Sequence, residues 1–131
     1  MIRGIRATTW LLAGVLAAGL SGCILVAAGA GAGGAVYMTG HTAEAIIDRP
    51  IDSTADAVER VLANEGVSIT ASRREDSGAR RTWEGTQGER EITITVSRES
   101  DGRTKVQAVV KRNAVSWDDD YAKALLAKII A

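Results

Sequence analysis

The stretch ITITVSRESDGRTKVQAVV, residues 92–110, decides the fold of this chain. Its first part, residues 92–97, alternates apolar residues with threonine and serine, and its last part places valine or alanine at Val106, Ala108 and Val110. Alternation with a period of two is typical of a strand that buries one face. The Asp101-Gly102 pair between the two parts favours a tight turn. The stretch therefore predicts an antiparallel hairpin with one face in the core.

Two further strands are predicted before this hairpin. Residues 80–86 carry Trp83 as their one large apolar group, and residues 67–71 alternate apolar residues with serine and threonine, starting inward at Val67 and Ile69. A polar turn over residues 75–78 separates the two. Further towards the N-terminus, residues 41–48 alternate weakly and predict a first strand, which Pro50 ends because proline cannot donate a hydrogen bond to a sheet.

Two amphipathic helices complete the predicted elements. Residues 53–64 place apolar side chains three and four positions apart, with Asp52 or Ser53 as the N-cap and Gly66 at the stop. A last helix opens at Trp117 or Asp118, and the residues that form its apolar side are Tyr121, Leu125, Leu126, Ile129 and Ile130.

The order strand, helix, four strands, helix predicts an α+β fold. Short turns between the four consecutive strands imply an antiparallel arrangement, so we expect an antiparallel sheet of about five strands. Both helices would cover one face of this sheet in a two-layer sandwich. The other face would carry serine, threonine, lysine and arginine and meet water.

The N-terminus has the pattern of a secretory signal peptide over residues 1–22. Arg3 and Arg6 precede an apolar run from Trp10 to Leu20, and small residues precede Cys23. The run is too short to span a bilayer by itself, since a spanning helix needs about 20 apolar residues. The alternative for Cys23, the only cysteine, is a buried and unreactive thiol; an internal disulfide is excluded.

The four residues Leu20, Ser21, Gly22 and Cys23 resemble the lipobox of bacterial lipoproteins. This resemblance implies cleavage before Cys23, a thioether-linked diacylglyceryl group on its sulfur and a fatty acyl chain, such as palmitate, on its new amine. Two or more acyl chains hold a protein firmly to a membrane, so membrane lipid is the first expected partner. Ile24, rather than aspartate, follows the cysteine, which resembles the outer-membrane class of Gram-negative lipoproteins.

Residues 23–40 contain the lipidated cysteine and an uncharged segment rich in glycine and alanine. Three interpretations stay open for it. It forms an apolar tether at the membrane surface, or a helix that enters the bilayer or pairs with a copy of itself, or part of one uncleaved spanning helix. Gly29 and Gly33 have the spacing that lets membrane helices approach closely.

After cleavage, residues 41–131 are enough for one domain facing the periplasm. Basic and acidic side chains are equal in number over the whole chain, and this balance argues against nucleic acid as the partner. Phenylalanine is absent, so the core must be built from valine, isoleucine, leucine and alanine.

The whole arrangement resembles a family of small bacterial lipoproteins known only as a domain of unknown function. The stretches that carry the resemblance are residues 20–23, 29–34, 45–62 and 119–130. They correspond to a lipobox, a Gly/Ala-rich segment, a strand with a helix after proline, and a closing amphipathic helix. The resemblance implies no activity, cofactor or catalytic residue.

Few residues suggest chemistry. His41 is the only histidine and no second cysteine exists, so no metal site of the usual nitrogen and sulfur type is expected; we interpret His41 as a solvated linker side chain. The run Asp118 to Asp120 suits either calcium or, in our preferred interpretation, the first turn of a helix, where acidic groups meet unpaired amides.

Two other groups have an ordinary and a functional interpretation. The arginines around the turn at residues 75–78 form either a basic surface for anionic lipid or a solvated hairpin of mixed charge; they are Arg73, Arg74, Arg80 and Arg81. Trp83 and Trp117 either grip a ligand as an exposed pair or fill a thin core. We favour the mixed-charge hairpin and the core.

These features predict a non-enzymatic, lipid-anchored envelope lipoprotein with a small binding or structural module in the periplasm. Its partners would be membrane lipid through Cys23 and an envelope protein or a copy of itself, with no cofactor and no metal. One alternative is a membrane-embedded element that oligomerises through Gly29 and Gly33. A small periplasmic enzyme is a second alternative, which the lack of a nucleophile–base pair disfavours.

Overall fold

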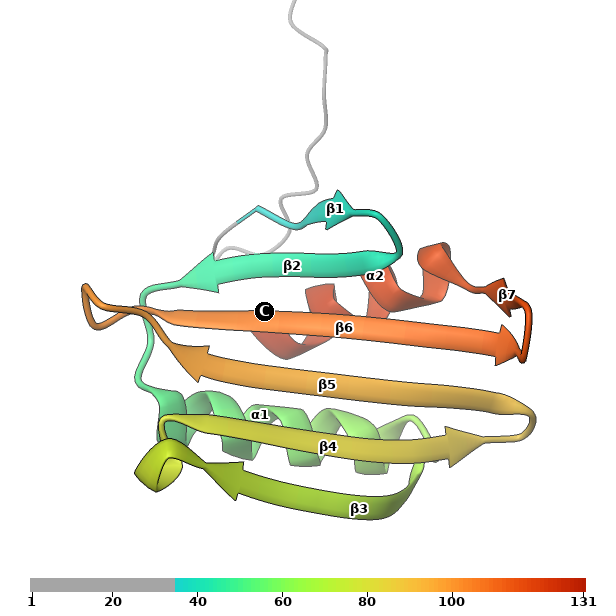
Figure 1. Ribbon diagram of the computed structural model, residues 1–131, viewed down its shortest axis with the longest axis horizontal. Coiled ribbons are helices and arrows are strands. Elements are labelled where there is room, and N and C mark those ends of the chain that lie inside the picture. The colour runs from blue at the N-terminus through green and yellow to red at the C-terminus, as the bar shows by residue number, and fades with distance from the viewer. Residues whose placement is uncertain (1–34) are drawn as a thin grey trace, which may run out of the picture.

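The computed structural model describes residues 35–131 (Figure 1). The predicted signal peptide, the lipobox residues Leu20, Ser21, Gly22 and Cys23, and the pair Gly29 and Gly33 lie outside the described residues. Neither helix of the described part has the length and apolar character needed to cross a membrane.

The described residues form two helices and one antiparallel sheet, which confirms the α+β prediction. The elements in chain order are β1 (Tyr37–Thr39), β2 (Thr42–Ile47), α1 (Ile51–Asn64), β3 (Ser68–Glu75), the short helix η1 (Asp76–Gly78), β4 (Arg80–Gln87), β5 (Arg90–Arg98), β6 (Thr104–Asn113), β7 (Ser116–Trp117) and α2 (Asp119–Ile130). The sheet has seven strands in place of about five. The additional two, β1 and β7, are too short to show a pattern of alternation.

The sheet order is β1-β2-β6-β5-β4-β3, with β7 also paired to β6. The four strands from β3 to β6 follow one another through short turns, as expected, and β2 adds to the free edge of β6 (Figure 1). α1 therefore carries the chain beneath the sheet, from β2 to the far edge at β3. This crossover leaves β2 beside the last long strand of the domain.

The hairpin of residues 92–110 lies in the middle of the sheet, as its pattern predicts. Ile94 pairs with Ala108 and Val96 with Val106, and all four side chains are buried. Gly102 has a φ of +89°, a left-handed conformation that glycine adopts without steric cost. The predicted turn at Asp101-Gly102 is confirmed.

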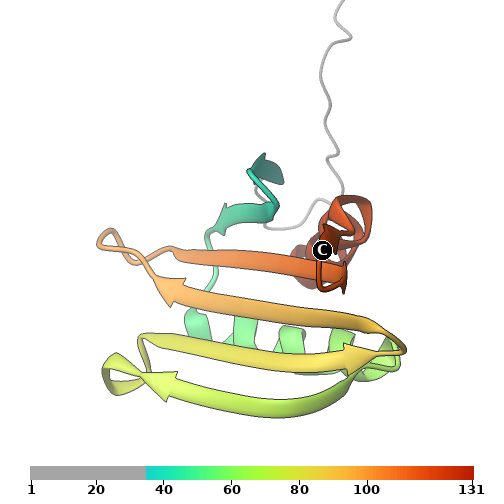
Figure 2. The ribbon, with the colours of Figure 1, turned by 45° about the vertical axis from the view of Figure 1, so that its right-hand side comes forward.

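Both helices cover the same face of the sheet, as predicted (Figure 2). α2 packs on β2 and β6, and α1 packs on β5 and β3 and also against α2. The core lies between the sheet and the two helices, and Trp83 is its largest side chain. Its largest fully buried members are Ile47, Val58, Leu62, Ile92, Ile94, Val96, Val106, Val110, Leu125, Leu126 and Ile129.

The inward alternation predicted for residues 67–71 is wrong in part. Val67 is buried, but it precedes the strand, and Ile69 is 44% exposed. β3 is the outer strand of the sheet, and its register with β4 shifts between Ile69 and Ala71. Such a bulge bends an edge strand and discourages pairing with other chains.

The predicted N-cap of α1 is also corrected. The helix begins earlier, with Pro50 at the N-cap, and neither Asp52 nor Ser53 caps it. The carbonyl oxygen of Pro50 instead accepts hydrogen bonds from the hydroxyls of Ser53 and of the buried Thr54. Asp52 forms an ion pair with Arg81 of β4, which fixes the start of the helix against the sheet.

The folded part begins before residue 41. Tyr37–Thr39, which the sequence placed in the apolar segment, forms the strand β1 through a turn at Gly40, whose φ is +64°. The Tyr37 hydroxyl donates a hydrogen bond of 2.9 Å to Glu44 on β2. Pairing with β2 thus places these residues in the sheet and not in the segment that the sequence predicts as a tether.

Candidate functional site

Asp118 is the one carboxylate among the described residues that is buried, with 6% of its surface exposed. One oxygen caps α2 by accepting the backbone N–H of Tyr121 at 3.1 Å. The other oxygen accepts a hydrogen bond from Nε of Arg90 at 3.1 Å. The guanidinium of Arg112 lies 3.6 Å from the capping oxygen. The helix-cap interpretation of Asp118 is therefore confirmed.

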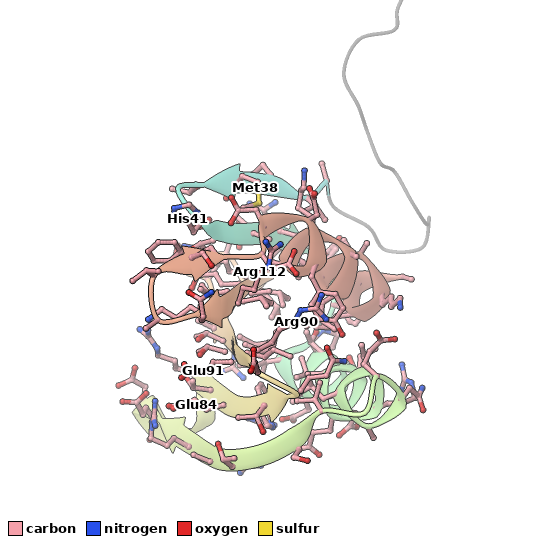
Figure 3. All side chains as sticks on the ribbon, turned by 90° about the vertical axis from the view of Figure 1, so that its right-hand side faces the viewer. Met38, His41, Glu84, Arg90, Glu91 and Arg112 are labelled. Atoms are coloured by element: carbon pink, nitrogen blue, oxygen red, sulfur yellow. The ribbon has the colours of Figure 1, made fainter. Side chains whose placement is uncertain are left out.

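The charge of Asp118 is stabilised despite its burial. Desolvation is the largest single influence and opposes the ionised form, but the Tyr121 amide and the guanidinium groups of Arg112 and Arg90 together outweigh it. The pKa of Asp118 is consequently held below its ordinary value. Figure 3 shows Arg90 and Arg112 at the end of the sheet where α2 begins.

A polar network extends from Arg90 across this end of the domain. The guanidinium lies 4.3 Å from the ring centre of Tyr121 and donates to Gln87 at 2.9 Å. Gln87 in turn donates to the Tyr121 hydroxyl at 2.9 Å and to the carbonyl of Glu65 at 2.7 Å. The network connects the β4–β5 turn with the start of α2 and the end of α1.

Glu65 closes the network at the end of α1. Its carboxylate accepts from the Tyr121 hydroxyl at 3.1 Å and from Lys128 at 2.7 Å. The hydrogen bond from Lys128 lowers the pKa of Glu65, and the same bond raises the pKa of Lys128. Burial raises the pKa of Tyr121. Each of these groups has a hydrogen-bond partner within the network. We therefore interpret the network as a structural contact that holds the two helices together.

The second polar cluster lies at the corner where β2 starts and β7 ends. The His41 ring is parallel to the Trp117 ring with 4.1 Å between centroids, and its Nδ1 lies 3.0 Å from a carboxylate oxygen of Asp119. Lys111 lies 5.9 Å from the centre of the Trp117 ring. The interpretation of His41 as a solvated linker side chain is wrong in part: 49% of the side chain is exposed, but tertiary contacts hold it in the domain.

The two tryptophans do not form a pair. Trp83 is 3% exposed, belongs to the core and donates its Nε1 hydrogen to Glu59 at 3.2 Å, whereas Trp117 is 37% exposed. The core interpretation is confirmed for Trp83 and wrong for Trp117. The local sequence gives no signal for this difference, because it depends on which residues stand opposite each tryptophan.

The arginines around η1 form the expected hairpin of mixed charge. Arg73 pairs with Glu84 at 2.7 Å, and Arg81 reaches across to Asp52 on α1. Because carboxylates neutralise these two guanidinium groups, the structure favours the hairpin of mixed charge over a basic surface, but Arg81 is not solvated, since its side chain is only 13% exposed.

A shallow, open depression of about 320 Å³ lies at the opposite end of the sheet from α2's first turn. Its residues are Asp48, Arg49, Pro50, Ile51, Asp52, Arg98 and Gly102. Two of its charged side chains already have partners: Arg49 donates to the last carbonyls of α2, at Ile129 and Ile130, and Asp52 binds Arg81. Within residues 35–131, no group of three potential metal ligands occurs.

The sequence did not reveal the partners that assemble the two clusters. His41 and Asp119 are 78 positions apart, and Lys128 and Glu65 are 63 apart. The placement of β2 beside β6, with α2 across both strands, brings His41 to Asp119, and the packing of α1 against α2 brings Glu65 to Lys128. A sequence signal existed for Asp118 alone, as a helix cap.

The sequence model of the family described as "Protein of unknown function (DUF3568)" matches residues 6–131, and the chain belongs to this family. No curated protein matches the chain. The expected membership in a family of unknown function is thus confirmed, and it assigns no activity.

Proposed function

We propose that this member of the DUF3568 family is a lipid-anchored envelope lipoprotein whose domain serves as a non-enzymatic binding or structural module in the periplasm. The observation that carries the proposal is the sequence Leu20-Ser21-Gly22-Cys23 directly after a basic start and an apolar run. A thiol at this position is a good nucleophile for alkylation by a lipid, and at least two acyl chains give stable anchoring.

The arrangement of the domain supports this role. Its first strand, β1, begins at Tyr37, only a short segment after Cys23, so an anchored domain would sit close to the bilayer. The polar clusters of the described part act as helix caps and ion pairs between elements. A domain held together in this way is suited to presenting a binding surface near the membrane. Ile24, which follows Cys23 in place of aspartate, favours the inner leaflet of the outer membrane.

A second candidate is a membrane-embedded element that assembles through its glycine-rich segment. Gly29 and Gly33 carry this alternative, because small residues four apart permit close helix contact in lipid. Crosslinking separates the two candidates. Loss of oligomers in a protein carrying Gly29→Leu and Gly33→Leu would favour assembly, and an unchanged ratio of monomer to oligomer would count against it.

The Cys23→Ala variant tests the anchor. We expect the wild-type protein to be cleaved before Cys23, to carry the mass of its acyl chains and to fractionate with the outer membrane. The alanine variant should lack the added mass and leave the outer membrane fraction, because the sulfur that receives the diacylglyceryl group is gone. Intact-mass analysis and density-gradient fractionation measure both effects.

Ser21→Ala is the matched control, because alanine keeps a small residue at the same distance from the cleavage position. Its mass and fractionation should equal those of the wild type. If the wild-type protein carries no lipid and fractionates as Cys23→Ala does, the anchoring proposal is overturned.

A further inference from the structure

The corner around β7 exposes more apolar surface than its surroundings. Val115, in the turn between β6 and β7, is 81% exposed, and Trp117 is 37% exposed. Lys111 and Arg112 lie next to them at the end of β6. On α2, the side chain of Lys123 is 49% exposed. We call Val115, Trp117, Lys111 and Arg112 the hairpin corner.

We propose that the hairpin corner rests on the surface of the bilayer, with Val115 and Trp117 in the headgroup region. This inference depends on the proposed lipid anchor and adds the orientation of the domain. Tryptophan is enriched at membrane interfaces because its ring is apolar and its N–H polar. Lysine and arginine keep their charges at the headgroups while their alkyl chains lie along apolar surface.

The length of chain before the domain restricts how far the corner can be from the membrane. Residues 24–34 lie between the proposed lipidated Cys23 and the first described residue, and at about 3.5 Å per residue they span no more than about 40 Å. β6 alone, with ten residues at about 3.3 Å each, is about 33 Å long. The domain therefore stays within about its own length of the bilayer.

The chain enters the domain along the edge of the sheet that carries the corner. β1 has three residues and leads through Gly40 to His41, whose ring is stacked on Trp117. Because β1 runs antiparallel to β2, residues 35–36 lie towards the far end of β2, so the tether and the hairpin corner share one edge of the sheet. The opposite edge of the sheet, at β3, carries Ile69, which is 44% exposed, but this edge lies across the full width of the sheet.

The charges around the corner permit contact with anionic headgroups. Asp118 is buried and neutralised by Arg90 and Arg112, and Asp119 is engaged in a hydrogen bond with the His41 ring at 3.0 Å. Asp120 is exposed and has Lys123 at 3.8 Å. These pairs leave Lys111, which lies over Trp117, as the cation on the tryptophan itself.

Trp117 is also held in one orientation. His41 stacks on the ring, and Asp119 fixes His41 in turn. A side chain that is already ordered loses little further freedom when it enters an interface. The stacking thus prepares Trp117 to enter the headgroup region without reorganisation of the domain.

Fluorescence quenching of the mature, lipidated protein tests the orientation. Cleavage before Cys23 removes Trp10 and leaves Trp83 and Trp117, and Trp83 is 3% exposed. In phosphatidylethanolamine/phosphatidylglycerol vesicles brominated on the acyl chains, we expect the Trp117 emission to fall about twofold relative to unbrominated vesicles. The Trp117→Phe variant, which reports Trp83 alone, should show little quenching.

A tryptophan at the opposite edge supplies the matched control. The protein with Trp117→Phe and Ile69→Trp should bind the same vesicles and show no quenching by the bromines, because β3 faces away from them. Val115→Asp should reduce the quenching of Trp117 without loss of the anchor, since Val115 is too exposed to support the core.

Different failures have different meanings. If the lipidated protein is on the vesicles but aqueous iodide reaches Trp117 as freely as in soluble Cys23→Ala, the docking inference is overturned and the anchor stands. If Trp117 is shielded from both iodide and bromine, a protein covers the corner and the inference is again overturned. If the protein does not bind the vesicles, the proposed anchor itself fails.

Discussion

Replacement of Gly85 by alanine is expected to destabilise the domain by about 2–3 kcal/mol, near the upper end of the usual cost of an added core methyl. Gly85 is buried in β4, between Ile69 of β3 and Ile92 of β5. A Cβ atom there would lie 2.7 Å from the carbonyl oxygen of Ser68 and 2.8 Å from Cγ1 of Val67. The valine can rotate, but a backbone oxygen cannot. The edge strand would therefore have to move away from β4.

Urea denaturation of the wild type and the variant measures this loss as a lower transition midpoint. Thr86→Ala is the control, because Thr86 is the next residue of the same strand and is exposed; we expect a change of less than about 1 kcal/mol. Adding Val67→Ala to Gly85→Ala should recover little, since the contact with Ser68 remains. Equal stabilities for Gly85→Ala and Thr86→Ala would show that β3 adjusts freely.

The central hairpin could be predicted from the sequence because its signals are local. Residues 92–97 alternate, Asp101-Gly102 marks the turn, and each strand repeats the same pattern of burial. The face of a strand is determined by a period of two, so a long alternating run leaves one choice of register.

The edges of the sheet could not be predicted in the same way. β1 and β7 have three and two residues, and each exists because β2 or β6 offers a free row of backbone groups. Ile69 was expected to point inward with Val67, but the bulge after it shifts the strand. An edge strand has one neighbour in place of two, and its pattern therefore restricts its register less.

The two polar clusters depend on contacts across the whole chain. A single histidine beside a glycine-rich segment carries no sign that an aspartate far along the sequence will bind it. The helix cap at Asp118 was visible because capping is a local interaction. Its partners Arg90 and Arg112 were not, since they come from other strands. This is why the sequence located the helix start but not the network around it.

The closing prediction concerns that network. Asp118→Ala is expected to lower the free energy of unfolding by about 2–3 kcal/mol, of which the lost helix cap contributes about 1 kcal/mol and the lost ion pairs the remainder. The ion-pair share is kept below the value for a fully buried pair, because Arg90 is 37% exposed. For a domain of this size, the melting temperature should fall by at least about 8 °C.

Asp118→Asn separates the two contributions, because an amide oxygen still accepts the N–H of Tyr121 but carries no charge. Its stability at pH 7 should lie between those of the wild type and Asp118→Ala. If Asp118→Asn is as stable as the wild type while Asp118→Ala is not, the arginines contribute nothing and the cap alone matters.

The pH dependence gives an independent measure of the ion pairs. The folded pKa of Asp118 is lowered, so its charge stabilises the fold above its unfolded pKa of about 4, and this stabilisation is lost as the pH falls through the folded pKa. The difference in unfolding free energy between wild type and Asp118→Asn should hence be full between about pH 5 and 7 and shrink below about pH 4. A difference that stays constant down to about pH 2 would contradict the ion pairs, because a protonated Asp118 offers Arg90 and Arg112 no more charge than asparagine does.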